Sequence, residues 1–395
     1  MNIVLINHTH PDTAHVSALR MREFANCLAS AGDRAVLITG PLKPSDGGET
    51  LAELGARMAA HEWTLPFHIA CRLSETPLRR AAREGRMLAP FRQVVIGASY
   101  ISKGGMFGDW RTGVSNIFPL ITRQFSPDII FATFGNTDAW SIARDLARAA
   151  QCPWIADYKD PWDCFIPIGL RRRIAARYAD MSGMTVFSHT HAHDAAAWFP
   201  CAKEVVYSGY LIDPTNKLPE AENGNLRVML SGSIYDGSSI WLLIKALALV
   251  SKKANVVLNY AGNDGSRVRE MINRANSGVT FKDFGYLSID ALTRLQRSAS
   301  VNVYARNRNS LFQQKLIELI AVGRPVLAVP DEGEEAKNLV EAVGGTLIPA
   351  RNPAEIASGL ARLRTEEVSI DLERLRIFSW STQTEKLKRF FSSVL

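Results

Sequence analysis

The residues with the clearest chemical character lie near the start of an otherwise apolar segment, residues 310–330. Gln314, Lys315 and Glu318 are one to four residues apart, so on a helix they share one polar face. The apolar residues between them predict a buried helix that Gly323 ends, followed by a buried parallel strand. A helix N-terminus offers backbone N–H groups and a positive dipole, which suit a phosphate. The alternative is an ordinary solvated Lys–Glu pair on a core helix.

This segment resembles the nucleotide-sugar motif of the family 4 glycosyltransferases, which have the two-domain GT-B fold. The matching positions are Glu318, Ala321, Gly323, Pro325 and Val326. Residues 314–319 are similar to the Lys-Leu-Phe-Glu version of many bacterial members. The first glutamate of the motif corresponds to Ser310, so the chain departs from the family there. The resemblance implies that Glu318 holds the ribose hydroxyls of the donor.

Residues 153–162, PWIADYKDPW, carry a second resemblance to the bacterial enzymes of this family. It implies a set of residues that face the acceptor, namely Asp157, Lys159, Asp160 and Trp162. Read by itself, Asp160-Pro161 makes a turn that the aspartate caps, so the alternative for Asp160 is a structural role. Its place in a loop after a strand favours function. The expected catalytic residues are Asp160, His8 and Ser310.

The loop after the predicted strand 226–231 is a second point of departure. The family often supplies an arginine and a lysine to the donor diphosphate here, whereas this chain has Ser233 and Ser238. We expect that either the backbone N–H groups of the loop bind the phosphates, or Lys315 and Arg306 carry the charge. The loop at residues 285–287 resembles the loop that lies against the nucleobase in this family. The expected donor-side residues are Gly232, Ser233, Gly285, Tyr286, Arg306, Gln314, Lys315 and Glu318.

The loop after the first predicted strand is rich in histidine. It holds His8, His10, Asp12 and His15, and it should lie at the carboxyl edge of a parallel sheet, where α/β proteins bind ligands. We assign His10 to the acceptor side, beside the catalytic His8. No HExxH or similar spacing supports a metal site, and GxGxxG is absent, so we expect neither a metal nor a dinucleotide.

Residues 72–92 combine arginines with apolar side chains. The arginines are Arg72, Arg79, Arg80, Arg83, Arg86 and Arg92, and the apolar neighbours are Leu73, Leu78, Met87, Leu88 and Phe91. One interpretation is a basic amphipathic helix that lies on a membrane or on a lipid-linked acceptor. The other is an ordinary surface helix whose arginine stems cover apolar area.

The domain organisation follows from length and pattern. A chain of 395 residues predicts two domains, and strands alternate with helices in both halves, which indicates an α/β fold. The resemblance implies GT-B, with two doubly wound Rossmann-like domains facing a central cleft and a C-terminal helix that returns to the first domain. The expected parts are an acceptor-side domain at 1–212, a linker at 213–225, a nucleotide-sugar-binding domain at 226–375, and the returning helix at 376–395.

Composition limits the partners and the location. The formal charge of +7 fits anionic substrates or an anionic membrane surface, and no nucleic-acid motif accompanies it. No apolar run approaches the roughly 20 residues that span a bilayer, and residues 1–7 contain no basic leader region. The five cysteines lack CxxC spacing and predict reduced thiols. We therefore expect a cytoplasmic protein that makes peripheral contact with the inner face of the membrane.

The resemblance implies a retaining, metal-independent glycosyltransferase without a cofactor. The donor would be a UDP-, GDP- or dTDP-linked sugar, and the acceptor a hydroxyl of a glycan, a lipid-linked glycan or a small molecule, in bacterial surface polysaccharide or glycoconjugate synthesis. One alternative is a nucleotide-sugar epimerase of the same fold, which would need further acid and base residues. Another is a catalytically silent partner that binds a nucleotide or a glycan and supports another transferase.

Overall fold

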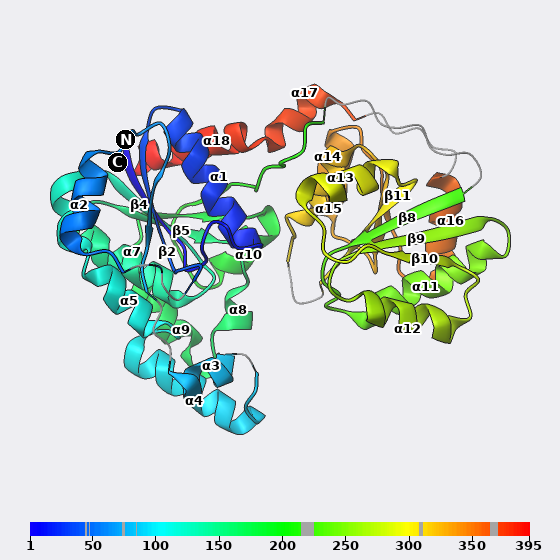
Figure 1. Ribbon diagram of the computed structural model, residues 1–395, viewed down its shortest axis with the longest axis horizontal. Helices are drawn as coiled ribbons and strands as arrows, with labels where there is room; N and C mark the ends of the chain where they lie inside the picture. Colours follow the sequence, from blue (N-terminus) through cyan, green and yellow to red (C-terminus); the bar gives the residue numbers. More distant parts are fainter. Residues whose placement is uncertain are drawn as a thin grey trace. The chain divides into compact units, whose positions relative to one another are not determined.

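The computed structural model divides into two compact units (Figure 1). The first comprises Met1–Ser208 and Trp380–Leu395, and the second comprises Gly209–Ser379. The residues that the structure describes are 1–43, 46, 48–72, 76–83, 85–214, 225–307, 311–363 and 370–395. Most of the expected linker, 215–224, and the expected catalytic Ser310 lie outside them.

The first domain contains a seven-stranded parallel sheet in the order β3-β2-β1-β4-β5-β6-β7. The strands are β1 (Asn2–Ile6), β2 (Arg34–Thr39), β3 (Phe67–Ala70), β4 (Ile129–Thr133), β5 (Trp154–Tyr158), β6 (Gly183–Val186) and β7 (Lys203–Val205). The central strands are almost entirely apolar because helices bury both faces of the sheet.

The helices of the first domain alternate with these strands. They are α1 (Val16–Ser30), α2 (Leu51–Ala59), α3 (Pro77–Arg83), α4 (Ala89–Lys103), α5 (Gly108–Ser115), α6 (Phe118–Leu120), α7 (Thr137–Ala150), α8 (Trp162–Phe165), α9 (Arg171–Ala175), α10 (His189–Ala196) and α18 (Trp380–Val394). Short turns of π- and 3₁₀-helix lie at Ile121–Phe125, Ile168–Leu170 and Ala176–Tyr178.

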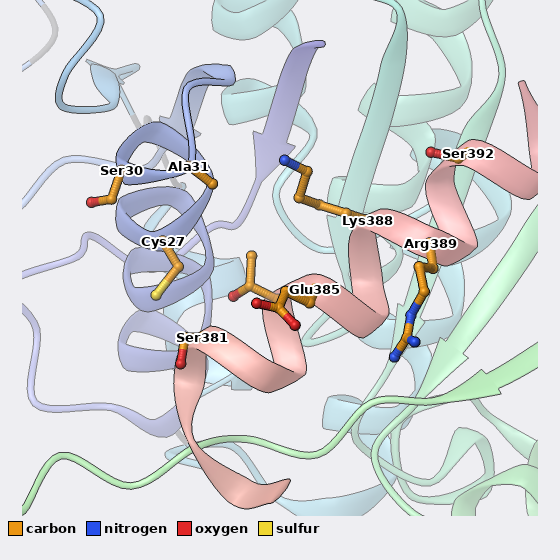
Figure 2. Close-up of a pocket in the computed structure, with 9 residues that line it drawn as sticks. Cys27, Ser30, Ala31, Ser381, Glu385, Lys388, Arg389 and Ser392 are labelled. Carbon is orange, nitrogen blue, oxygen red and sulfur yellow. The ribbon is translucent and has the colours of Figure 1, made fainter. Parts of the chain in front are cut away.

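Helix α18, at the end of the chain, packs beside α1 and completes the first domain. The ring centroids of Phe24 and Trp380 are 5.4 Å apart, and those of Phe131 and Phe391 are also 5.4 Å apart. The Nζ of Lys388 lies 2.6 Å from a carboxylate oxygen of Asp33. Figure 2 shows the groove that remains between the two helices, lined mainly by small and polar side chains.

The second domain contains a six-stranded parallel sheet in the order β10-β9-β8-β11-β12-β13. The strands are β8 (Asn225–Ser231), β9 (Asn255–Ala261), β10 (Thr280–Asp283), β11 (Val301–Ala305), β12 (Val326–Val329) and β13 (Leu347–Pro349). The helices are α11 (Gly237–Ser251), α12 (Gly265–Ala275), α13 (Ile289–Ser298), α14 (Lys315–Val322), α15 (Glu334–Ala342), α16 (Pro353–Leu363) and α17 (Leu372–Leu375), with a 3₁₀ turn at Arg376–Phe378.

Two doubly wound parallel sheets confirm the predicted α/β fold class. In each sheet the order reverses next to the first strand of the domain, between β1 and β4 and between β8 and β11. Open α/β sheets bind ligands at the carboxyl ends of the strands beside such a reversal. Helix α14 forms where the sequence predicts it, and Gly323 ends it with φ 85°, in the left-handed region that suits glycine.

Candidate active site

The Lys315 amine lies at the carboxyl edge of the second sheet. Lys315 begins α14, and its Nζ donates a hydrogen bond to the backbone carbonyl of Ser231, the last residue of β8. Gly232 follows with φ 87°, and a Cβ added there would lie 3.8 Å from the Lys315 Nζ. The amine therefore stands next to the loop that the sequence assigns to the donor phosphates.

Glu318 and Gln314 complete a polar cluster with Lys315. The Nε2 of Gln314 donates to the Oε1 of Glu318 at 3.0 Å. Burial lowers the pKa of Lys315 to about 8, and the charge of Glu318 partly opposes this. Burial raises the pKa of Glu318, whereas Gln314 and Lys315 act in the opposite direction. The Lys315 amine and the Glu318 carboxylate are thus partly buried and hydrogen-bonded to specific partners. They are not the freely solvated ion pair that the sequence left as the alternative.

The loop after β8 is held in place by Tyr260. The Tyr260 hydroxyl donates to the carbonyl of Gly232 at 2.8 Å and accepts from the N–H of Asp264 at 3.0 Å. A Cβ at Gly262 would lie 2.4 Å from this hydroxyl, so only glycine fits there. The carboxylate of Asp264 in turn accepts from the N–H of Ile234 at 2.8 Å.

Three N–H donors at this loop already have partners within the domain. The N–H of Gly232 donates to the carbonyl of Ala261 at 2.8 Å, and the N–H of Ile234 is also bonded. Asp236 caps the N-terminus of α11 and accepts from the Ser238 N–H at 2.9 Å. The Gly232 N–H is therefore not free for a phosphate, because the sheet uses that donor, and the choice between the other N–H groups of the loop and the charges of Lys315 and Arg306 stays a prediction. Lys315 remains the cation beside the loop.

Gly285 and Tyr286 lie on the neighbouring loop, after β10. The carbonyl of Gly285 accepts from the N–H of Gly262 at 2.9 Å, and its own N–H donates to Asp283 at 3.0 Å. Tyr286 is 69% exposed. Exposed Ser233 lies on the β8 loop, so the predicted nucleobase and phosphate residues share the carboxyl edge of this sheet.

Arg306 has a carboxylate partner that the sequence analysis missed. It follows β11, and its Nε lies 3.7 Å from the Oε1 of Glu332, which follows the adjacent strand β12. The Glu332 side chain is only 4% exposed. Burial raises the pKa of Glu332, and burial together with the Glu332 charge raises the pKa of Tyr304. The signal in the sequence is the acidic run 331–335 directly after a buried strand.

In the first domain, the loops after β1 and β4 meet around His8. The His8 ring stacks on Phe107 with centroids 5.5 Å apart and planes inclined by 22°. A Cβ at Gly135 would lie 2.7 Å from the His8 ring, so the close approach of the β4 loop needs glycine. The Oγ1 of Thr9 lies 3.2 Å from the His8 Nε2.

His10 pairs with a histidine that the sequence analysis did not single out. Its ring contacts His68 edge-on, with centroids 4.8 Å apart. Burial, and secondarily the charge of His10, lowers the pKa of His68 to about 4, so His68 is neutral near pH 7. The Oγ1 of Thr39 lies 2.8 Å from the His68 Nε2. Thr39 and His68 lie on the adjacent strands β2 and β3, which brings their side chains together.

Lys159 and Asp160 form an ion pair after β5, and the Asp160 side chain is 30% exposed. His15 lies within their electrostatic reach. Burial lowers the pKa of His15, the Lys159 charge lowers it further, and the Asp160 charge raises it. The His15 ring also accepts from the Ser17 N–H at 3.2 Å and so caps α1. Asp160 is therefore reachable by a ligand, with a histidine nearby.

Two expected acceptor residues are instead part of the core. Asp157 is fully buried and accepts two hydrogen bonds from Arg20, at 2.8 and 3.0 Å, and one from Thr185 at 2.8 Å. Burial alone would raise the pKa of Asp157, but Arg20 and the hydrogen bonds outweigh it and lower this pKa. Trp162 is fully buried and stacks on Trp140 with centroids 5.8 Å apart. The acceptor-side assignment of both residues is wrong because their side chains point into packed structure.

Within the described ranges, no group of three or more His, Cys, Asp or Glu side chains could hold a metal ion. In the same part of the chain, no helix has the length and apolar character needed to cross a bilayer.

Residues 225–366 match the family model described as "Glycosyl transferases group 1". No curated protein matches the chain in sequence. Among solved structures, the Anabaena protein HepE in complex with UDP and glucose is 15% identical with a TM-score of 0.65, covering 99% of both chains. The lipopolysaccharide outer core galactosyltransferase WaaB is 13% identical with a TM-score of 0.65, covering 100% of both.

A solved structure from Listeria monocytogenes, described as a "putative UDP-N-acetylglucosamine 2-epimerase", is also related in fold. It is 13% identical with a TM-score of 0.54, covering 99% of this chain and 97% of its own. At these identities the likenesses show the fold. Together with the family match to the second domain, they confirm the resemblance to GT-B bacterial glycosyltransferases.

Proposed function

We propose that this chain is a glycosyltransferase that moves a sugar from a nucleoside diphosphate to a hydroxyl acceptor. The observation that carries the proposal is the polar cluster at the start of α14. The Lys315 amine is bonded at the end of β8, and Glu318 lies one helical turn further on. The cluster lies within residues 225–366, which match the group 1 glycosyltransferases.

Each donor-side residue has a role that its chemistry supports. Lys315 supplies positive charge to the diphosphate, and Glu318 accepts hydrogen bonds from the two ribose hydroxyls. The exposed ring of Tyr286 offers a stacking surface for the nucleobase. A fixed cation stabilises the charge that develops on the leaving diphosphate, which is the work that the proposed metal-independent, retaining reaction requires.

The acceptor side of the proposal rests on the first domain. Asp160 is the accessible carboxylate beside Lys159 and His15, and His8 lies at the carboxyl end of β1. We assign to this edge the acceptor hydroxyl of a glycan, of a lipid-linked glycan or of a small molecule at the inner face of the membrane. The fold that the chain shares with the lipopolysaccharide galactosyltransferase WaaB supports a place in surface polysaccharide synthesis.

A thermal-shift screen with UDP, GDP and dTDP tests the donor site. One nucleotide should stabilise the protein, since a ligand at 100 times its dissociation constant adds about 2.7 kcal/mol. UDP is the first to try, because the HepE structures hold UDP. If none of the three shifts the melting temperature, while each still stabilises an authentic glycosyltransferase that uses it, the proposed donor site is refuted.

The epimerase-like fold of the Listeria protein motivates a second candidate function. An epimerase incubated with a nucleotide sugar alone returns an isomeric nucleotide sugar. A glycosyltransferase instead releases nucleoside diphosphate and free or transferred sugar, and a silent binding partner leaves the donor intact. Chromatography of the nucleotide products separates all three.

A further inference from the structure

Helix α4 carries an apolar face that no other part of the described chain covers. Leu88 directly precedes the helix and is 75% exposed. Within the helix, Phe91 is 64% exposed, Val94 69% and Ile101 56%. Their spacing, with exposed Ala98 between the last two, puts them on one side of a helix. Scattered single apolar residues are normal on a surface, but a contiguous stripe along one helix marks an interaction site.

The opposite face of α4 is anchored, so the stripe cannot turn inward. The buried Tyr100 donates through its hydroxyl to the carbonyl of Phe165 at 3.3 Å, and its own carbonyl accepts from Arg177 at 3.4 Å. The Oγ1 of Thr137 donates to the carbonyl of Gly104, which ends the helix, at 2.8 Å.

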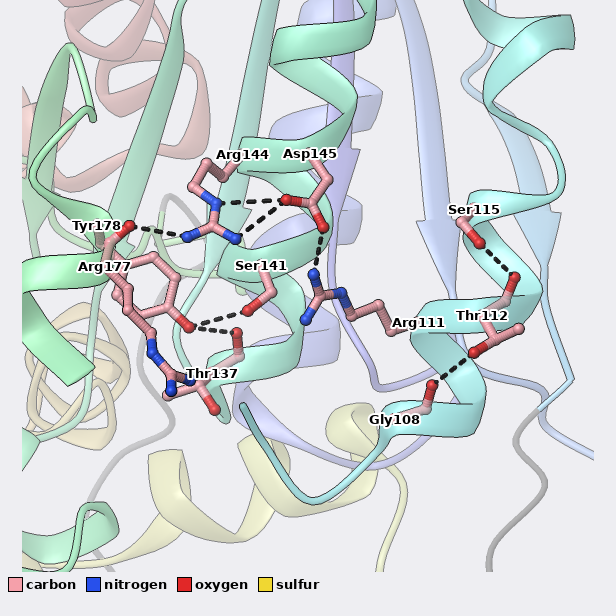
Figure 3. A network of polar contacts seen from close by, with 10 residues as sticks. All are labelled: Gly108, Arg111, Thr112, Ser115, Thr137, Ser141, Arg144, Asp145, Arg177 and Tyr178. Carbon is pink, nitrogen blue, oxygen red and sulfur yellow. Dashed lines mark hydrogen bonds and ion pairs between the residues drawn. The ribbon is translucent and has the colours of Figure 1, made fainter. Parts of the chain in front are cut away.

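The anchoring residues belong to a wider network of polar contacts (Figure 3). The Tyr178 hydroxyl donates to the carbonyl of Thr137 at 3.0 Å and lies 2.9 Å from the Ser141 hydroxyl. Arg144 donates to the carbonyl of Arg177 at 2.9 Å. The helix is thus fixed from α7 and from the turn Ala176–Tyr178, with its apolar side outward.

The surroundings of the stripe are strongly basic. Residues 64–107 contain seven arginine and lysine residues but only two glutamates. Arg80, Arg86 and Arg92 are exposed, and the Nε of Arg92 donates to the carbonyl of Ala82 at 2.8 Å, which ties α3 to α4. Figure 1 shows these two helices together at one end of the first domain.

We propose that one face of α4 docks the protein on a bilayer surface rich in anionic lipid. This α4 face consists of Leu88, Phe91, Val94, Ala98 and Ile101, with the arginines beside it. A basic helix with exposed apolar residues inserts that side into the headgroup region while its arginines meet the lipid phosphates. A second copy of the chain fits less well, because a symmetric contact would bring like charges together. The surface adds a partner to the proposed function, but its evidence is independent of sugar transfer.

The test is co-sedimentation of the full chain with vesicles of phosphatidylcholine alone or mixed with phosphatidylglycerol. The protein should bind the mixed vesicles and release them at high salt. Phe91→Ser and Val94→Ser should each weaken binding about tenfold, from the lost apolar burial. Arg80→Glu and Arg86→Glu should each weaken it at least fivefold, since one basic residue near an anionic surface contributes about 1 kcal/mol.

Matched controls lie on α11 and just beyond it, in the second domain. Leu249→Ser removes an apolar side chain that is 44% exposed, and Lys252→Glu reverses an exposed charge. Neither should alter vesicle binding, and circular dichroism should show every variant folded. Equal binding to both vesicle types, or no binding at all, overturns the proposal.

Light scattering tests the competing occupant of the face. A dimer that Phe91→Ser dissociates, together with unchanged vesicle binding, would make the face a protein interface and would also overturn the proposal. Nucleoside diphosphate release from the donor with a soluble acceptor should be the same in these variants as in the natural chain. A failure of vesicle binding is thereby separated from a failure of the proposed function.

Discussion

At the scale of single residues, the charge of the Lys315 amine depends on its own pKa, which lies only slightly above neutral pH. Burial lowers this pKa to about 8, so the amine carries its proton below pH 8 and loses it above. A diphosphate binds the charged form, so the affinity for UDP or the preferred diphosphate should fall as the pH rises through about 8. Calorimetric titration at several pH values measures this.

Lys315→Met is the matched variant for that titration. It should weaken binding of the nucleoside diphosphate much more than binding of the nucleoside, because only the former carries the phosphates. It should also remove the fall in affinity above pH 8. A variant that keeps the same pH dependence would show that another group is responsible.

Glu318 tests the ribose side of the same cluster. Glu318→Gln keeps the shape but replaces charged hydrogen bonds with neutral ones, so nucleoside binding should weaken by about 1–3 kcal/mol. Glu334→Gln, an exposed position at the start of α15, is the control and should bind as the natural chain does. Equal nucleoside affinity in both variants would remove Glu318 from the site.

At the scale of elements, the Tyr260 hydroxyl joins the β8 loop to the loop after β9. Tyr260→Phe leaves the carbonyl of Gly232 and the N–H of Asp264 without this partner. The free energy of unfolding should fall by about 1–3 kcal/mol, and diphosphate binding should weaken with it. Urea unfolding measures the first effect. Tyr235→Phe, at a side chain 70% exposed, is the control, and an equal loss there would contradict the role of Tyr260.

The Arg20–Asp157 pair joins α1 to strand β5 and, through Thr185, to β6. Asp157→Asn leaves Arg20 buried without its counter-charge and should cost about 3–5 kcal/mol of stability. Because folding lowers the pKa of Asp157, its contribution is present above the ordinary pKa of an aspartate and is lost as the pH falls through the lowered value. Asp163→Asn, at a side chain 47% exposed, should melt as the natural chain does.

Most elements could be predicted from the sequence because their signals are local. The aliphatic run at 326–329, the polar face of α14 and the glycine that ends it depend on neighbours only a few residues away. The environment of Asp157 could not be predicted in this way. Its partner Arg20 lies 137 residues earlier in the chain, and only the register of the sheet and the packing of α1 bring them together.

The same limit applies to parts of the candidate site. The sequence places Gly232 at the right edge of the sheet, but whether its N–H is free depends on pairing with β9. Glu332 was missed because its contact with Arg306 joins the ends of two strands that are neighbours only in the folded sheet. Trp162 looked like a ligand-binding residue, yet aromatic packing with distant residues determines its position.

At the scale of the whole molecule, the chain consists of two parallel-sheet units, each with candidate functional residues at the carboxyl edge of its sheet. The division lies at 208 and 379, a few residues before and after the expected bounds at 212 and 375. The central cleft, the acceptor contacts of Asp160 and the role of Ser310 stay predictions. Sugar transfer requires that the second domain hold a donor whose bond to the diphosphate is then broken.

The most direct test is therefore release of nucleoside diphosphate from a panel of nucleotide sugars without added acceptor. The natural chain should release diphosphate from at least one donor. Lys315→Met should slow this release at least tenfold, from the loss of one charge-assisted hydrogen bond to the leaving group, about 1.5–3 kcal/mol. Lys337→Met, at an exposed lysine of α15, should release it at the natural rate. Release that is equally fast in both variants, or donors returned intact or isomerised by the natural chain, would contradict the account.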